Sequence, residues 1–145
     1  MSIAIDEAHL AACRGEVPVG AVLVDPASKK IIARNGNRVV ELKDPTAHAE
    51  MLVIREAASI LSSIRLVDFE LYVTLEPCAM CATAISLARI KKLEFGAYDP
   101  KSGGVEHGAM VFNHATCHHT PNIIGGVREI ENSKILRAFF SNLRS

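Results

Sequence analysis

Two short motifs, each at the beginning of a predicted helix, constrain the fold of this 145-residue chain most strongly. The motifs are His48-Ala49-Glu50 and Pro77-Cys78-Ala79-Met80-Cys81. Cys78 and Cys81 are three positions apart, so both thiols lie on one helical face and can bind one ion. His48 and Glu50 are two positions apart and can converge only on a point beyond the N-terminus of their helix. A fold that uses both motifs must therefore direct two helix N-termini at one centre.

Together the motifs supply one imidazole and two thiolates, which are three ligands for a tetrahedral zinc ion. Each motif alone is a weak signal, because Cys-x-x-Cys also occurs as a redox pair, as half of a zinc site, or as two small buried residues. Three ligands leave one coordination position open, as in catalytic zinc sites. We therefore expect His48, Cys78 and Cys81 to hold one catalytic Zn²⁺.

Glu50 is the remaining acid of this group, and a three-ligand zinc site does not need it as a fourth ligand. Taken alone, an acid in the first turn of a helix indicates only a solvated residue that stabilises the helix dipole. Two residues from a zinc ligand, a carboxylate is instead placed to move the protons of a zinc-bound water. We interpret Glu50 as a catalytic proton shuttle.

The rest of the chain alternates strand-like and helix-like segments, which predicts a sheet with helices on both faces. We expect helices over 6–14, 46–61, 78–88 and 128–143, and strands over 17–24, 29–34, 69–75, 92–98 and within 122–127. The segments 35–45 and 103–121 are expected to be loops, the second with at most one helical turn. No repeat or linker interrupts this order, so residues 1–145 are predicted to form a single zinc-dependent domain.

Composition and charge limit the possible classes of function and indicate the cellular compartment. Lys and Arg total 16, as do Asp and Glu, so binding of nucleic acid by bulk charge is excluded while a local basic patch is not. The longest stretch without an acidic or basic residue, 107–127, contains four His, two Asn and a Pro, so no membrane span is expected. The first six residues do not resemble a signal peptide, and the four cysteines then predict metal or thiol chemistry in the cytoplasm.

The pattern H-x-E…P-C-x-x-C is the signature of zinc-dependent deaminases. The sequence around it resembles the bacterial family of tRNA-specific adenosine deaminases. The resemblance rests on GEVPVGAV at 15–22, DPTAHAE at 44–50, LYVTLEPCAMC at 71–81, FGAYDPK at 95–101 and Phe139-Phe140. It covers nearly the whole chain, and these stretches are far more specific than the bare signature.

This resemblance implies an α/β fold of the cytidine-deaminase type, a three-layer α/β/α sandwich around a central mixed five-stranded sheet. It also implies a homodimer that binds the anticodon stem-loop of tRNA and converts the wobble adenosine to inosine by hydrolysis. In that reaction a zinc-bound hydroxide attacks C6 of adenine, and the metal is one Zn²⁺ per chain.

Site residues follow from the resemblance by their positions in the motifs. His48, Cys78 and Cys81 match the zinc ligands, and Glu50 matches the proton shuttle. Other positions match groups that contact the substrate: Asn37 a purine-contacting asparagine, Asp99 and Lys101 a loop that meets the anticodon backbone, and Arg144 the basic end of the last helix. Two stretches depart from the usual pattern, Gly104-Val105-Glu106-His107-Gly108 and His118-His119, and both lie where the resemblance places RNA.

Three other functions share part of these signals. A deaminase of a free nucleobase or nucleoside, of the guanine or cytosine type, carries the same zinc signature. A non-catalytic, zinc-stabilised interaction module would need neither the open coordination position nor Glu50. A dithiol oxidoreductase would need neither the metal nor His48.

Two further cysteines lie outside the motifs. Cys117-His118-His119 offers three potential ligands in a row, but adjacent residues rarely converge on one ion. We therefore interpret this stretch as loop packing or as a platform for base stacking rather than as a second metal site. Cys13, on an apolar helix, is expected to be a small buried residue.

Overall fold

A computed structural model describes residues 1–144 of the chain, and five strands among them form one mixed sheet. The helices are α1 (Ser2–Cys13), α2 (Val39–Leu42), α3 (Ala49–Leu61), α4 (Ala79–Leu87) and α5 (Glu129–Arg144), with a 3-10 turn at Val111–Asn113. The strands are β1 (Gly20–Asp25), β2 (Lys30–Gly36), β3 (Glu70–Leu75), β4 (Lys92–Ala97) and β5 (Asn122–Ile124). Within these residues no helix is long and apolar enough to cross a lipid bilayer.

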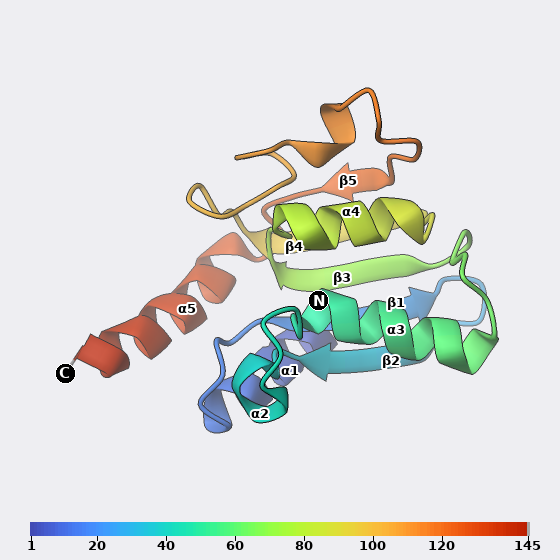
Figure 1. Ribbon diagram of the computed structural model, residues 1–145. Coiled ribbons are helices and arrows are strands. Elements are labelled where there is room, and N and C mark those ends of the chain that lie inside the picture. Colours follow the sequence, from blue (N-terminus) through green and yellow to red (C-terminus); the bar gives the residue numbers. More distant parts are fainter. Residues whose placement is uncertain (145) are drawn as a thin grey trace.

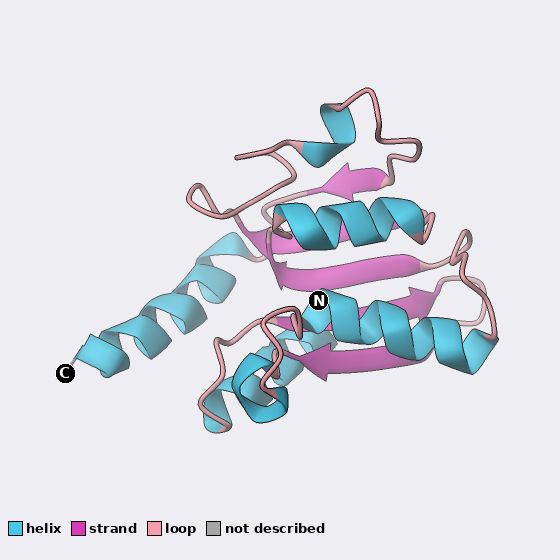
Figure 2. Cartoon of the chain, in the orientation of Figure 1, coloured by secondary structure: helices cyan, strands magenta, loops and turns pink. Residues whose placement is uncertain are grey.

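The sheet has the strand order β2-β1-β3-β4-β5 and is covered on both faces (Figure 1). β1 is antiparallel to β2 and to β3, whereas β4 is parallel to β3 and to β5. Helices α3 and α4 lie side by side over one face, and α1 lies behind the sheet (Figures 1 and 2). The start of α5 packs on β4 and contacts α1. These three layers confirm the predicted α/β/α sandwich.

The central strands are buried because helices cover both of their faces, as is usual for parallel strands in α/β proteins. Val73 and Phe95 are partners in the register of β3 and β4, and both are fully buried. On the same side α3 and α4 contribute small and branched apolar residues, including Val53, Ala57 and Ile85. Burying a side chain such as Val, Ile or Phe stabilises the fold by roughly 1.5–3 kcal/mol each. This core therefore holds α3 and α4, which begin at the two motifs, in fixed positions on the sheet.

Helix α1 approaches the sheet closely because two glycines face it. Gly20 of β1 pairs with Gly36 of β2. A Cβ atom on Gly20 would overlap the carbonyl oxygen of Ala4, and one on Gly36 would lie 2.7 Å from that of Glu7. The helix begins at Ser2 rather than at residue 6, because Ala4 and Ile5 extend its buried stripe toward the N-terminus.

The structure corrects three other local predictions, which concern the burial of Cys13, the start of the first strand and the loop at 35–45. Cys13 is exposed, because it ends α1 on the side opposite the buried stripe of Ala4, Ala8 and Ala11. The first strand begins at Gly20 rather than at residue 17, since Pro18 has no N–H for the ladder and Val19 donates to the Val17 carbonyl.

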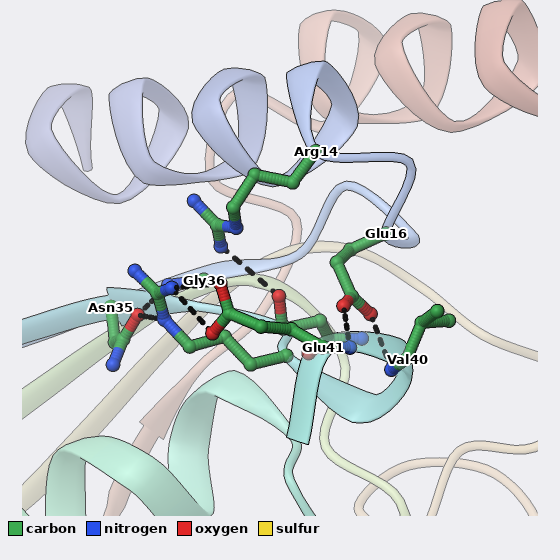
Figure 3. A network of polar contacts seen from close by, with 8 residues as sticks. Arg14, Glu16, Asn35, Gly36, Val40 and Glu41 are labelled. Carbon is green, nitrogen blue, oxygen red and sulfur yellow. Dashed lines mark hydrogen bonds and ion pairs between the residues drawn. The ribbon is translucent and has the colours of Figure 1, made fainter. Parts of the chain in front are cut away.

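The expected loop 35–45 contains the short helix α2. Glu16, which is distant in the sequence, caps this helix: its carboxylate accepts the backbone N–H groups of Val40 at 3.1 Å and of Glu41 at 2.9 Å (Figure 3). Local sequence could not indicate this helix, because its capping residue lies more than 20 positions earlier in the chain.

Gly36→Ala is expected to lower the free energy of unfolding by about 1–3 kcal/mol, because the new methyl group would press on α1 without room to relax. Urea unfolding followed by circular dichroism measures the change. Ser59→Ala, on the exposed side of α3, serves as control and should stay within about 0.5 kcal/mol of the wild type. A Gly36→Ala protein as stable as the wild type would contradict the close packing of α1 on β2.

Candidate active site

A cavity of about 220 Å³ lies at the edge of the sheet where β3 and β4 end. Because β1 runs antiparallel to β3, the start of β1 and the end of β2 reach the same edge. The cavity is lined by residues from these strand ends and from the two motifs: Val17, Val19, Asn37, His48, Glu50, Leu75, Glu76, Cys78, Asp99 and Ser102. Ligand sites of open α/β sheets commonly lie at the carboxyl ends of their parallel strands.

The two motifs meet in this cavity as the sequence predicts. His48 is the N-cap residue of α3, and Cys78 is the N-cap residue of α4. Nδ1 of His48 lies 3.6 Å from Sγ of Cys78 and 3.6 Å from Sγ of Cys81. A tetrahedral zinc ion with ordinary Zn–S and Zn–N bonds requires N···S separations of about 3.6 Å. Within residues 1–144, these three side chains form the only group with metal-ligand spacing, and they fit zinc.

The two thiols have opposite pKa shifts. Hydrogen bonds from Cys81 and His48 lower the pKa of Cys78 to about 4, so Cys78 is a thiolate at neutral pH. The hydrogen bond to Cys78, together with burial, raises the pKa of Cys81. The protein alone therefore holds one thiolate and one thiol, and binding of a divalent cation releases the second proton.

Glu50 lies in the first turn of α3 and is buried, with only 4% of its surface exposed. This burial excludes the interpretation of Glu50 as a solvated acid at a helix end. Desolvation raises the pKa of its carboxyl group above the ordinary value for glutamate. Glu50 lines the cavity beside His48 and is not a member of the metal-ligand group.

Asn37 follows β2 and lines the cavity. Its Oδ1 accepts the backbone N–H of Ala49 at 2.8 Å, which caps the first turn of α3. Its own backbone is held on both sides: its N–H donates to the Val19 carbonyl, and its carbonyl accepts from the Arg14 guanidinium at 3.1 Å. One lone pair of the side-chain oxygen is thus used within the protein, and the amide NH₂ group supplies two donors.

Glu76 is a site residue to which sequence analysis assigned no role, although it stands directly before the Pro-Cys motif. Only 2% of its surface is exposed. Its carboxylate accepts four backbone N–H groups and bonds to the Nδ1 atom of His107, all from the segment 99–107. Although burial alone raises the pKa of Glu76, these hydrogen bonds outweigh it and lower the pKa.

Of the other predicted substrate-contacting residues, one lies in the cavity and two lie on the surface. Asp99 lines the cavity, and its Oδ1 accepts the backbone N–H groups of Lys101 and Ser102. Lys101 itself is exposed on that turn. Arg144 is exposed at the end of α5, which projects away from the sheet (Figure 1).

The segment 117–119 packs against α4. Sγ of Cys117 lies 3.3 Å from Oγ of Ser86, and Nε2 of His119 lies 2.7 Å from the Ile90 carbonyl oxygen. The carbonyl of His118 accepts from Arg89 at 2.9 Å. These contacts confirm loop packing, and no second group with metal-ligand spacing occurs in the part of the chain that the structure describes.

Comparison with known proteins agrees with this geometry. Residues 1–97 match the model of the cytidine and deoxycytidylate deaminase zinc-binding region. The chain therefore belongs to the family of zinc-dependent cytidine and deoxycytidylate deaminases and is an enzyme of that class.

Within this class the similarity to one group extends over the whole chain. A tRNA-specific adenosine deaminase of Agrobacterium fabrum is 54% identical over 144 residues, which cover 99% of this chain and 93% of the relative. A solved structure from studies of A-to-I editing by tRNA:A34 deaminases superposes with a TM-score of 0.90 at 54% identity, covering 94% of this chain and 97% of that one. A guanine deaminase from Nitrosomonas europaea superposes with a TM-score of 0.84 at 19% identity, over 97% of this chain and 82% of that one. The last comparison shows the shared fold alone.

We predict about one tightly bound zinc ion per chain, and its loss in Cys78→Ser, because two ligands would remain where three are needed. Metal analysis by plasma mass spectrometry of the purified proteins provides the measurement. Cys13→Ser, which replaces the exposed cysteine of α1, is the matched control and should retain full zinc content. Zinc-free wild-type protein with full activity would show that the site does not depend on this metal.

Proposed function

We propose that this enzyme deaminates the wobble adenosine of tRNA anticodons to inosine, with residues 1–145 forming one domain. The observation that carries the proposal is a buried carboxylate, Glu50, in a cavity that is also lined by two of the three convergent metal ligands. Similarity over the full chain to tRNA-specific adenosine deaminases supports adenosine in tRNA as the substrate. The resemblance also supports a homodimer in the cytoplasm, and the apolar side chains of Ile60 and Leu87, exposed on α3 and α4, are compatible with a second copy.

His48, Cys78 and Cys81 would hold the zinc ion through Nδ1 and the two Sγ atoms. When bound, zinc lowers the pKa of a water molecule to near neutrality and so supplies the nucleophile. Two thiolates and a neutral imidazole balance the charge of the ion, which leaves the centre formally neutral. The helix N-termini at His48 and Cys78 direct partial positive charge at the same point.

Glu50 moves the protons of the reaction. It accepts a proton from the attacking water and delivers it to N1 of adenine as the new C6–O bond forms. It then passes the second proton of that water to the amino group, so that the C6–N bond breaks and ammonia leaves. Burial raises the pKa of Glu50 toward neutrality, which suits a group that must both accept and release a proton.

Asn37 would orient the base through its amide NH₂ group. Oδ1 already accepts the N–H of Ala49, which fixes the side chain and leaves its NH₂ group as a donor for the base. N7 of adenine is an acceptor on the edge next to the reacting amino group. Asn37 therefore orients the base by donating to N7.

Asp99, Lys101 and Arg144 would contact the anticodon outside the base pocket. Asp99 shapes the turn that carries Lys101 through its hydrogen bonds to backbone N–H groups. Lys101 and Arg144 are exposed cations suited to phosphate groups. Their modest number agrees with the zero net charge and with recognition of a folded loop rather than of RNA in general.

A free-nucleobase deaminase is the competing function, since a guanine deaminase shares the fold. We expect kcat/KM for an anticodon stem-loop with a wobble adenosine to exceed that for free adenosine by on the order of 100-fold or more, because contacts remote from the base help to position it. Inosine formation is read by sequencing and by chromatography, with a stem-loop whose only adenosines lie outside the wobble position as control. Binding should weaken with added salt. Equal turnover of free guanine or cytosine would favour the competing function.

Glu50→Ala should reduce deamination by at least about 10²–10⁴-fold while zinc content and stem-loop affinity stay near wild type. The reason is that Glu50 moves protons and does not hold the metal. Single-turnover kinetics, metal analysis and fluorescence anisotropy measure the three quantities. Glu56→Ala, which removes an exposed glutamate of the same helix, is the matched control and should stay fully active. Loss of zinc in Glu50→Ala would identify Glu50 as a fourth ligand and the site as structural.

A further inference from the structure

The segment 99–107 contributes Asp99 and Ser102 to one wall of the cavity, and most of its hydrogen bonds to the rest of the chain go to a single buried side chain. Oε1 of Glu76 accepts the N–H of Asp99 at 3.0 Å and lies 2.8 Å from Nδ1 of His107. Oε2 accepts the N–H groups of Val105, Glu106 and His107 at 3.2, 2.9 and 3.0 Å. Both ends of the segment are thus tied to one carboxylate, which lies at the end of β3, two residues before Cys78.

Few other contacts hold the segment: the N–H of Gly104 donates to the Pro77 carbonyl at 2.8 Å, and the Gly104 carbonyl accepts from Val111 at 2.8 Å. Of its side chains only Val105 joins the hydrophobic core, and Pro100, Lys101, Ser102 and Glu106 are exposed. Gly103 and Gly104 bring the backbone close to Glu76 and to α4: a Cβ atom on Gly103 would overlap Oε2 of Glu76, and one on Gly104 would lie 2.5 Å from the N atom of Ala79. The backbone is therefore shaped to fit around the carboxylate.

We propose that Glu76 is a positioning residue that fixes the 99–107 segment as the substrate-facing wall of the cavity. This inference rests on the proposed function, because it assigns Asp99 and its turn to the RNA side of the same site. Glu76 acts through the backbone and not on the reacting atoms, since five protein partners already occupy both of its oxygens. Its task is distinct from that of Glu50, although both carboxylates line the same cavity.

His107 adds a side-chain contact to Glu76. It lies in the stretch 104–108 that departs from the usual pattern, and its ring bonds to Glu76 and packs edge-on against Tyr98 at 5.9 Å between centroids. The stretch that departs from the usual pattern therefore helps to hold the wall in place. Through it, the Glu76 carboxylate gains a side-chain partner in addition to the backbone N–H groups.

Glu76→Gln tests the inference, because it keeps the shape of the side chain but replaces one acceptor oxygen with an NH₂ group that faces N–H donors. Amide hydrogen exchange is measured on the zinc-loaded full chain. We expect the amides of residues 99 and 105–107 to exchange at least about tenfold faster, the change that 1.4 kcal/mol would produce. KM for the stem-loop should rise by more than kcat falls, and zinc content should not change.

Glu16→Gln is the matched control, because Glu16 is also buried and also caps backbone N–H groups (Figure 3). In Glu16→Gln, faster exchange should be confined to the amides of Val40 and Glu41 in α2. If Glu76→Gln folds poorly, Gly103→Ala tests the same point with the carboxylate intact, because its methyl group would displace the segment from Glu76.

Unchanged exchange over 99–107 in Glu76→Gln, or a fall in kcat with KM unchanged, would overturn the inference. Zinc loss together with faster exchange throughout the chain would also overturn it, since Glu76 would then be a general structural residue. A wild-type protein that leaves wobble-adenosine stem-loops unedited would instead overturn the proposed function, and the exchange data would still decide whether Glu76 holds the wall.

Discussion

The parallel pairing of β3 with β4 is the constraint on which the site depends. It brings the ends of both strands to one edge, where Leu75 pairs with Ala97 and the N–H of Glu76 donates to the Ala97 carbonyl. A parallel connection requires a crossover, and here the crossover contains helix α4, whose N-cap residue is Cys78. The antiparallel β1 then places the end of β2 at the same edge and leads the chain to His48 at the start of α3. The metal centre is therefore a consequence of sheet topology, and its ligands need no special loop to meet.

The sequence could predict the elements of this topology and the group of metal ligands, because both follow from local signals. Apolar runs of strand length and helix-forming stripes mark the alternation, and the spacing of Cys78 and Cys81 is typical of one helical face. The convergence of His48 with the thiols could be inferred because His48 and Glu50 can meet only at a point beyond the N-terminus of their helix, and Cys78 also lies at a helix N-terminus. Helix α2 and the exposure of Cys13 could not be predicted in the same way. The first depends on Glu16, distant in sequence, and the second on which side of α1 meets the sheet.

Substrate-facing residues were harder to place than metal ligands for a related reason. A ligand set has a fixed geometry that the spacing of residues must satisfy, whereas contacts with RNA depend on the path of loops. Asn37 illustrates the difference: its residue type indicates both a donor and an acceptor, but the fold uses the acceptor to cap α3. Only the structure shows this use of the Asn37 oxygen, and that Asp99 shapes a turn through its hydrogen bonds to backbone N–H groups.

Four glutamates are buried among the described residues, and their partners separate them into different tasks. Glu7 forms an ion pair with Arg34 at 2.7 Å, and Glu16 caps α2. Glu76 accepts hydrogen bonds from four backbone N–H groups of the 99–107 segment. In each case a cation or several hydrogen-bond donors hold the carboxylate in a fixed position. Glu50 lies instead beside the metal-ligand group, with only its own backbone N–H and the Cys81 thiol affecting its pKa through hydrogen bonds, and burial outweighs both and raises that pKa. A carboxylate that is stabilised by many donors makes a good anchor and a poor proton shuttle, because protonation would cost it those bonds. The same residue type thus supplies both the supports of the cavity and its proton carrier, and the difference lies in how many donors the fold directs at each one.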